Sequence, residues 1–423
     1  MRKHFSLLLA AFATCLSGWA ATTYEIGSAS DLEAFAAKVN AGETDACAVL
    51  TADIDLADVT HTPIGTADWM FCGTIDGQYH TISNLNNMLC GTIDGATLTK
   101  IIVASGEIKD NTEYAPHTGV FAGTCGTTKP NTISYCISGA NVVTSTGDTS
   151  GFVGKMYGTI ENCAFTGTLK AVTSTGAFIG SDYGAAPLNA TVKNCFVLSN
   201  SIQSDAYLGA ICGWQDSGSF DNIFVCCPTH VNFGRESGTN TNLFSVSADQ
   251  MASGEVAFRL NGDQSNIVWY QNIGEDPMPT LDSTHKQVYA AGEMRCDGTP
   301  LGTIEYSNTP STIPAHEFEE GFCTVCGQAQ VDYCEMDADG YYLIGDLARL
   351  EWFAKAVNAG TLKNGKMKLT ADIDFGDVEH TPIGTPSKMF SGIIDGQFHK
   401  LSNLNNMLCG TIDGATLTRI IVE

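Results

Sequence analysis

The chain is poor in charge, and above all in positive charge. Charged residues make up 16% of its 423 residues, and 46 acidic residues against 21 basic ones give a formal net charge of −25. An ordinary globular domain carries about 25% charged residues. Because nucleic acid and anionic membrane surfaces are bound through clustered Lys and Arg, this composition excludes both as partners. The hydrophobic content of 43% and the low charge also exclude charge-driven disorder.

Long apolar runs are also missing. No stretch after residue 20 is long and apolar enough to span a bilayer. Residues 1–20 have the pattern of a secretory signal peptide: Arg2 and Lys3 precede a short apolar core, and small residues stand before a cleavage point after Ala20. We therefore expect a secreted or cell-surface protein. The alternatives are a buried N-terminal helix and, because of Cys15, a lipid-modified N-terminus.

What is abundant is repetition. Residues 24–103 return as residues 342–422, and Asn84–Thr99 recurs without change at Asn403–Thr418. A finer repeat of roughly 25 to 33 residues fills the region between residues 71 and 227. Its short apolar runs are separated by Gly, Asn, Thr and Ser, and no helix-length periodicity interrupts them. This pattern predicts an all-β fold, a parallel β-helix solenoid in which equivalent residues of successive coils stack.

Two features specify the solenoid further. Cys136, Cys163 and Cys195 recur at the same place in the fine repeat, and we expect them to be small core residues that stack through the coils. Short helices are expected to cap the exposed ends. The spacing Ser30-x-x-Glu33 predicts a capping box, and we expect that helix to cover the first coil.

The other end of the first module has a similar pattern. Ser247-x-x-Gln250 predicts a second capping box, and the segment Val268–Leu281 is expected to close that end of the solenoid. In the second copy, Asp346 is the expected N-cap.

These patterns predict five segments. They are a signal peptide (residues 1–20), β-helix module 1 (22–230), its C-terminal cap (231–290), a small Cys/His linker (291–336) and the truncated start of β-helix module 2 (337–423).

The linker holds the best candidate for a metal site. Cys323-x-x-Cys326 followed by Gly is the usual knuckle of a tetrahedral zinc site, and Cys296 and His316 would complete a Cys3His set. A structural zinc would order a segment too short for a large apolar core. The alternative is a disulfide, in which Cys323 pairs with Cys326, Cys296 or Cys334, because cysteines of exported proteins often oxidise.

Other candidate residues favour structural roles. Asp53 and Asp55 put two carboxylates on one face of a strand; a calcium site or a glycosidase acid pair competes with a polar, solvent-facing edge, and we prefer the edge. His61 and His80 lie in turn-rich segments, where hydrogen bonding is the expected role. No catalytic residues and no cofactor other than zinc are predicted.

The ordered motifs resemble those of secreted bacterial surface proteins built from GLUG-type and related β-helix repeats. The resemblance is carried by six segments: Ser30–Ala36, Leu50–Leu56, Thr62–Gly65, Gly73–Leu85, Met251–Phe258 and Trp269–Asp276. It implies a right-handed parallel β-helix and an extracellular or cell-surface location, but no particular reaction.

We therefore expect a non-catalytic, adhesin-like repeat protein that serves as a stalk or platform for an extracellular glycan or surface protein. The alternative is a carbohydrate-active enzyme, a polysaccharide lyase or glycoside hydrolase, on the same scaffold. Tyr183, Tyr207 and Trp214 are the aromatic residues that would favour glycan binding if they are exposed, and the alternative role for them is to fill the core.

Overall fold

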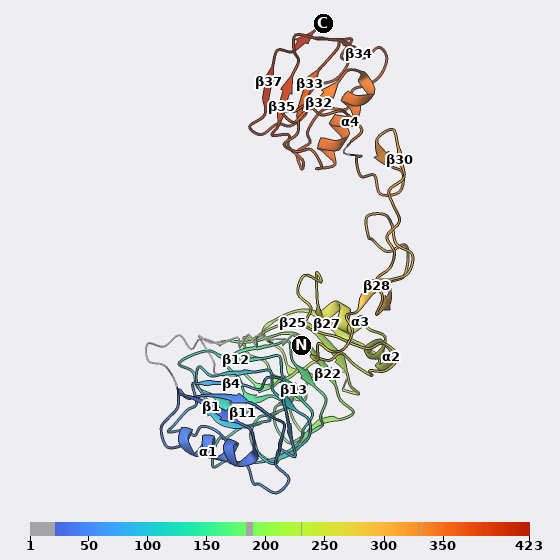
Figure 1. The fold of residues 1–423 in the computed structure, drawn as a ribbon. Coiled ribbons are helices and arrows are strands. Elements are labelled where there is room, and N and C mark those ends of the chain that lie inside the picture. The colour runs from blue at the N-terminus through green and yellow to red at the C-terminus, as the bar shows by residue number, and fades with distance from the viewer. Residues whose placement is uncertain (1–21, 183–188, 230, 331) are drawn as a thin grey trace, which may run out of the picture. The chain divides into compact units, whose positions relative to one another are not determined.

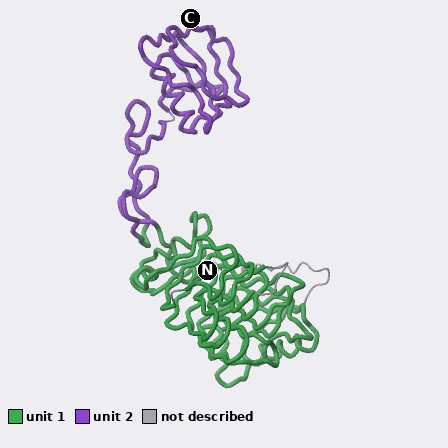
Figure 2. The backbone as a smooth tube through the Cα atoms, turned by 180° about the vertical axis from the view of Figure 1, so that it is seen from behind, with its two compact units in different colours: residues 1–289, 306–309 green, residues 290–305, 310–423 purple. Residues whose placement is uncertain are grey.

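The computed structural model describes residues 22–182, 189–229, 231–330 and 332–423 (Figure 1). The expected signal peptide lies outside the described residues. The chain divides into two compact units (Figure 2). The first comprises Met1–Tyr289 and Tyr306–Thr309, and the second comprises Ala290–Glu305 and Pro310–Glu423.

Unit 1 is built on a parallel β-helix, as the fine repeat predicts. Its longest sheet has two columns of strands that merge where the later strands lengthen. The first column contains β1 (Thr23–Ile26), β2 (Cys47–Leu50), β4 (Thr74–Asp76), β7 (Thr97–Thr99), β12 (Asn131–Ser134) and β17 (Gly158–Glu161). The second contains β3 (Ile54–Asp55), β5 (Thr81–Ser83), β8 (Ile102–Val103), β13 (Ile137–Ser138) and β18 (Ala164–Phe165). Both continue into β22 (Ala190–Leu198), β25 (Ser219–Cys226) and β27 (Thr239–Ser245).

Three further parallel sheets complete the coils. One contains β6 (Cys90–Ile93), β11 (Ala122–Cys125), β16 (Val153–Lys155), β21 (Ile179–Ser181), β24 (Cys212–Trp214) and β26 (Phe233–Arg235). The second contains β9 (Glu107–Lys109), β14 (Asn141–Val143), β19 (Leu169–Ala171) and β23 (Ile202–Ser204). The third contains β10 (Thr118–Gly119), β15 (Thr149–Ser150) and β20 (Thr175–Gly176). Each strand pairs in parallel with its equivalent one coil away, so side chains at matching positions stack.

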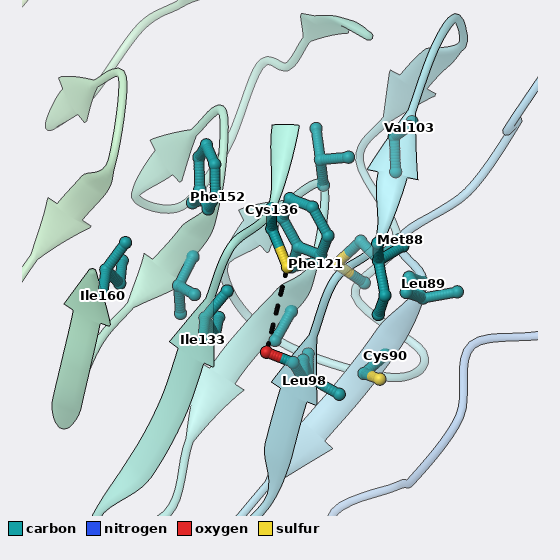
Figure 3. Close-up of a cluster of buried hydrophobic side chains, with 14 of the residues drawn as sticks. Met88, Leu89, Cys90, Leu98, Val103, Phe121, Ile133, Cys136, Phe152 and Ile160 are labelled. Atoms are coloured by element: carbon teal, nitrogen blue, oxygen red, sulfur yellow. Dashed lines mark hydrogen bonds between the residues drawn. The ribbon is translucent and has the colours of Figure 1, made fainter. Parts of the chain in front are cut away.

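The interior is a continuous apolar stack (Figure 3). Phe121, Phe152 and Phe178 stack in successive coils, with ring centroids 4.8 and 5.2 Å apart. The predicted cysteine ladder is confirmed: Cys136 and Cys163 are fully buried and, like Cys195, contribute to this core. Burial raises the pKa of the Cys163 thiol well above its usual 9, so this thiol stays protonated and unreactive.

One corner of the coil has a left-handed backbone in coil after coil. The corner comes directly after β7, β12 and β17 and lies inside the longer β22, β25 and β27. Its residues have φ between 51° and 56°; they are Lys100, Tyr135, Asn162, Asn194, Asn222 and Asn242. Asparagine tolerates this conformation better than most residues with a side chain. The asparagines also bond to each other, since Asn222 Nδ2 donates to Asn194 Oδ1 at 3.0 Å.

Helix α1 (Ala29–Val39) packs Leu32 and Phe35 into the core of the solenoid, as expected. Its predicted cap is wrong. The N-cap is Ser28, whose hydroxyl accepts from the Asp31 backbone N–H, and the helix therefore begins before Ser30. Glu33 is free for another role, which is described below.

The cap after β27 also differs from the expectation. The capping box of Ser247 and Gln250 is confirmed at the start of α2 (Ala248–Ala252), and α3 (Glu255–Leu260) follows. However, this segment and the buried Trp269 pack on the column Ala164, Phe196 and Phe224. These side chains point away from the core stacked inside the coils, so the segment covers a flank of the solenoid, whereas an end cap was predicted. Because two neighbouring apolar residues on a strand face opposite ways, both faces of the sheet need cover here.

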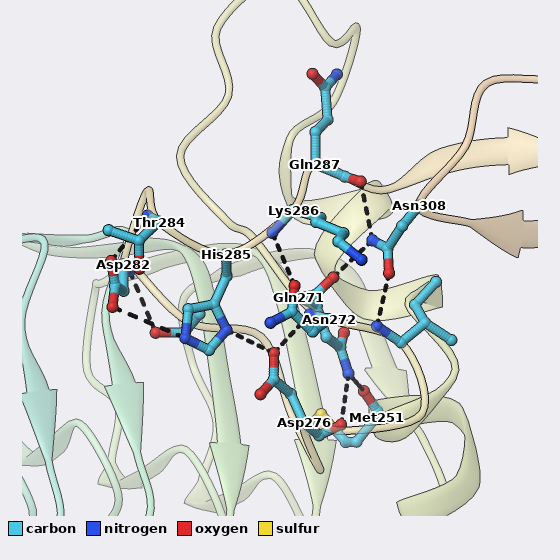
Figure 4. A network of polar contacts seen from close by, with 12 residues as sticks. Met251, Gln271, Asn272, Asp276, Asp282, Thr284, His285, Lys286, Gln287 and Asn308 are labelled. Carbon is cyan, nitrogen blue, oxygen red and sulfur yellow. Dashed lines mark hydrogen bonds and ion pairs between the residues drawn. The ribbon is translucent and has the colours of Figure 1, made fainter.

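A polar network holds the segment that covers the flank (Figure 4). Gln271 Nε2 donates to the Met251 carbonyl oxygen at 2.9 Å, and Asn308 Nδ2 donates to the carbonyl oxygens of Gln271 and Gln287 at 2.7 and 3.0 Å. His285 Nδ1 lies 2.7 Å from Asp276 Oδ2. The backbone of residues 268–271 is therefore fixed from several sides.

Unit 2 repeats the start of the solenoid after a segment with little regular structure. Strands β32 (Tyr341–Ile344), β33 (Lys366–Leu369), β35 (Ile393–Asp395) and β37 (Thr416–Thr418) form one parallel sheet, and β34 (Ile373–Asp374), β36 (Lys400–Ser402) and β38 (Ile421–Val422) form another. Helix α4 (Leu347–Asn358) starts at Asp346, which caps it as predicted. The remaining strands are two pairs, β28 (Tyr289–Ala291) with β29 (Glu305–Ser307), and β30 (Phe318–Glu319) with β31 (Phe322–Cys323).

None of the helices in the described part of the chain has the length and apolarity that a membrane crossing requires.

Candidate functional site

Three short pieces of unit 2 bring the four predicted metal ligands together. Cys296 lies in a tight turn, in which the Arg295 N–H donates to the Thr299 carbonyl oxygen at 2.7 Å and Gly298 has a φ of 80°. Cys323 ends the hairpin of β30 and β31, and its carbonyl oxygen accepts from the Gly327 N–H at 2.9 Å. This bond and the left-handed Gly327 fold Cys323 and Cys326 into a knuckle.

His316 completes the group. One ligand atom of each of the four residues can be chosen so that all four atoms lie within 4.8 Å of one another. The Sγ atoms of Cys296 and Cys323 are 3.3 Å apart, and His316 Nδ1 lies 3.4 Å from Cys326 Sγ. In a tetrahedral site with Zn–S bonds of about 2.3 Å, two ligand atoms are about 3.8 Å apart. The cluster therefore has the size and the donor atoms to hold a metal ion.

The electrostatics of the cluster favour at least one thiolate. The backbone N–H of Cys326 lowers the pKa of the Cys323 thiol to about 5. Burial and the neighbouring sulfur of Cys323 raise the pKa of Cys296, so that thiol keeps its proton beside the ionised Cys323. A bound divalent cation would let all three cysteines ionise, because it offsets the repulsion between their negative charges.

The disulfide alternative is not realised in this structure. The 3.3 Å between the Cys296 and Cys323 sulfur atoms is far longer than the about 2.05 Å of a disulfide bond. Cys334 belongs to a different environment, since it is buried in the apolar core of unit 2 beside Tyr342 and Trp352.

The acidic pair and the histidines have structural contacts. Asp53 accepts from the Thr81 backbone N–H at 2.8 Å and Asp55 accepts from the Ala57 N–H at 3.0 Å, so both carboxylates fasten turns. His80 lies 3.3 Å from Asp53 Oδ1. This arrangement agrees with the interpretation of a polar edge.

A contact that ties helix α1 to the following coil was not predicted from the sequence; it is called the tether below. His61 is buried, its Nδ1 lies 2.6 Å from Glu33 Oε1, and its Nε2 lies 3.0 Å from the Leu89 carbonyl oxygen. Unit 2 repeats the tether with His380 and Glu351. The available signal was the repetition of both residues at nearly the same separation in the two copies.

Two of the aromatic residues singled out in the sequence meet on the surface of unit 1. The ring centroids of Tyr207 and Trp214 are 4.5 Å apart, and the Arg235 guanidinium lies 4.4 Å from the centroid of the Trp214 ring. Tyr207 is 44% exposed. Trp214 and Arg235 are register partners in β24 and β26, which explains why they stack. Tyr183 lies outside the described residues.

Comparisons with known proteins add little. No protein-family model matches the chain, and no curated protein matches it. A solved structure from Bacteroides ovatus, described as a candidate immunoglobulin A1 protease, aligns over 62% of this chain and 92% of its own, with 17% identity and a TM-score of 0.41. A similarity this low supports no argument about function.

Proposed function

We propose that the chain is a non-catalytic, adhesin-like surface protein, related to the GLUG-type repeat proteins, that is exported through residues 1–20. Its stacked coils serve as a rigid platform on which glycans or surface proteins bind. The observation that carries the proposal is the surface cluster in which the exposed Tyr207 and Arg235 flank the partly buried Trp214. Aromatic rings with a polar neighbour suit ligands that are apolar on one face and polar at the edge, as sugars are.

The test is a binding screen of the full chain on arrays of polysaccharides and glycoproteins, with release of sugar measured in parallel. Binding without release is expected, and Trp214→Ala should remove most of the signal of any ligand held by this cluster. Trp69→Ala is the control, because Trp69 is a more exposed tryptophan (48%) elsewhere on unit 1. Cleavage of any polysaccharide at an enzyme-like rate would contradict the proposal.

We also propose that Cys296, His316, Cys323 and Cys326 bind a structural zinc ion. A Cys3His set in a closed turn is typical of sites that stabilise a fold, whereas catalytic zinc keeps a position open. The bound ion would order the segment around residues 294–329, where the described structure has only short strands and turns.

Metal analysis of the full chain tests this assignment. One zinc per chain is expected, with its loss in Cys326→Ser and its retention in Cys72→Ser, which alters a partly exposed cysteine of unit 1. Detection of a disulfide between any two of the four residues in unreduced protein would refute it.

A further inference from the structure

A pocket in unit 1 is lined by three tyrosines. It has a volume of about 250 Å³ and lies between the coil residues Tyr79 and Tyr135 and the segment around Tyr270. Asn266 and Ser283 add exposed polar side chains at its edge. The pocket is smaller than the about 300–1,000 Å³ of sites for drug-sized ligands, and one ring-sized group would fill it.

Two of the tyrosines have unfavourable backbone conformations. Tyr79 has a φ of 65° and Tyr135 a φ of 56°, in the left-handed region that bulky residues avoid. Tyr135 occupies the corner at which the next four coils have asparagine. Strained backbone conformations cluster at functional sites. The turn of Tyr79 recurs in unit 2 at Phe398 (φ 63°), so Tyr135 is the tyrosine whose residue type departs from that of the following coils.

Two of the three phenol groups are available to a ligand, since the Tyr270 hydroxyl donates to the Ile267 carbonyl oxygen at 3.3 Å. Burial, followed by the nearby Tyr135, raises the pKa of Tyr79, and Tyr270 adds to the effect. Within the part of the chain that the structure describes, neither the Tyr79 nor the Tyr135 hydroxyl makes a hydrogen bond with another residue. Tyr79 is 40% exposed, so its ring and hydroxyl are accessible to a ligand.

The far wall of the pocket is rigid. Asn261 Oδ1 accepts from the N–H groups of Val268 and Trp269, both at 2.9 Å. The network of Figure 4 fixes Gln271 on the other side of Tyr270. A wall held in this way loses little entropy when a ligand binds.

We propose that this pocket binds a single neutral hexopyranose ring, such as the end of a glycan chain. Aromatic faces suit the apolar C–H face of a sugar, and the phenol, amide and hydroxyl groups suit its hydroxyls. No Lys or Arg is found among the described lining residues, and the chain carries a net charge of −25, which disfavours an anionic sugar. The proposal rests on the glycan-binding function proposed above and assigns it a site.

The experiment uses the full chain and the methyl glycosides of glucose, galactose, mannose and N-acetylglucosamine, with binding followed by saturation-transfer NMR. At least one should bind, and Tyr135→Asn should weaken that binding at least about tenfold. The variant restores the residue of the neighbouring corners, so the melting temperature should stay the same or rise. Ser283→Ala changes an exposed side chain, so it should leave the melting temperature unchanged and weaken binding several-fold.

Phe398→Asn is the matched control, because it also replaces an aromatic residue of positive φ (63°), in unit 2. It should leave hexoside binding unchanged. Tyr207→Asn tests the other proposed cluster, that of Tyr207 and Trp214. Loss of binding in Tyr207→Asn but not in Tyr135→Asn would overturn the pocket while leaving the proposed glycan-binding function intact. Failure of all four glycosides to bind, or binding of a proline-rich peptide in their place, would also overturn the assignment of the pocket. In that case, binding of the same protein to a glycan array would still support the proposed function.

Discussion

The tether between α1 and the coils gives the sharpest prediction, for the substitution Glu33→Ala. Glu33 Oε1 lies 2.6 Å from His61 Nδ1, and its Oε2 accepts from the Thr62 N–H at 3.0 Å. The other ring nitrogen lies 3.0 Å from the Leu89 carbonyl oxygen. The substitution leaves a buried ring without its carboxylate partner.

The expected loss follows from the burial of the pair. The His61 side chain is fully buried and that of Glu33 is 22% exposed. Removing one partner of a fully buried ion pair costs about 3–5 kcal/mol, and losing a hydrogen bond to a charged group costs about 1.5–3 kcal/mol. Because Glu33 is partly exposed, we expect about 2–3 kcal/mol. In a unit of this size, that lowers the melting temperature by about 4–12 °C.

The assay combines thermal unfolding with hydrogen exchange of the α1 amides. Glu33→Ala should speed exchange in α1 and leave α4 unchanged. Glu351→Ala is the reciprocal control, because Glu351 holds His380 in the same way in unit 2; it should affect α4 alone. Unchanged exchange in α1 and a stability loss below about 0.5 kcal/mol would show that the tether contributes nothing.

The same pair has a predictable pH dependence. Burial opposes ionisation of Glu33, but hydrogen bonds from His61 and Thr62 outweigh it, so the pKa of Glu33 lies below its usual 4.5. A folded-state pKa below the unfolded value contributes stability above pH 4.5 that is lost as the pH falls through the folded pKa. Acid should therefore destabilise the wild type relative to Glu33→Ala, and the gap between them should narrow below pH 4.5. A gap that stays constant to lower pH would contradict this linkage.

Three other predictions concern the solenoid. Phe152→Ala should destabilise unit 1 by about 3–5 kcal/mol in chemical denaturation, because it opens a cavity in the aromatic stack; a loss under about 1 kcal/mol would show that the stack collapses around it. Gly73→Ala should lower the free energy of unfolding by at least about 3 kcal/mol, because the added Cβ would lie 1.9 Å from the Ala46 backbone oxygen. Gly274→Ala is the control: nothing lies within 4 Å of its Cβ, so only its left-handed φ should cost about 1–2 kcal/mol. In the folded protein, a maleimide should label the partly exposed Cys72 but not the buried Cys163; rapid labelling of Cys163 would refute its place in the core.

The parts of the fold that could be predicted were those that the sequence repeats. The stacking of Cys136, Cys163 and Cys195 follows from one residue type at one place in each coil, because parallel pairing puts equivalent positions in register. The Cys/His cluster could be predicted because Cys-x-x-Cys-Gly sets its own local geometry. Bringing in Cys296 and His316 required only short connections.

Features that depend on long-range packing could not be predicted. The capping box at Ser30 matched its pattern, but Glu33 reaches the buried His61, and Ser28 is the better N-cap. The cap was expected at an end because solenoid ends are apolar. The outward Phe196 and Phe224 provide a larger apolar surface on the flank, and the amphipathic helices cover that surface.

The left-handed corner has a consequence for how such a protein diversifies. The coils keep the same backbone there whether the residue is lysine, tyrosine or asparagine. A substitution at this corner therefore changes the surface of one coil and leaves the backbone of the others as it is. Each bulky occupant costs about 1–2 kcal/mol, against a net stability of about 5–15 kcal/mol for a domain. Only a few corners can carry such residues before their summed cost approaches the net stability of the domain.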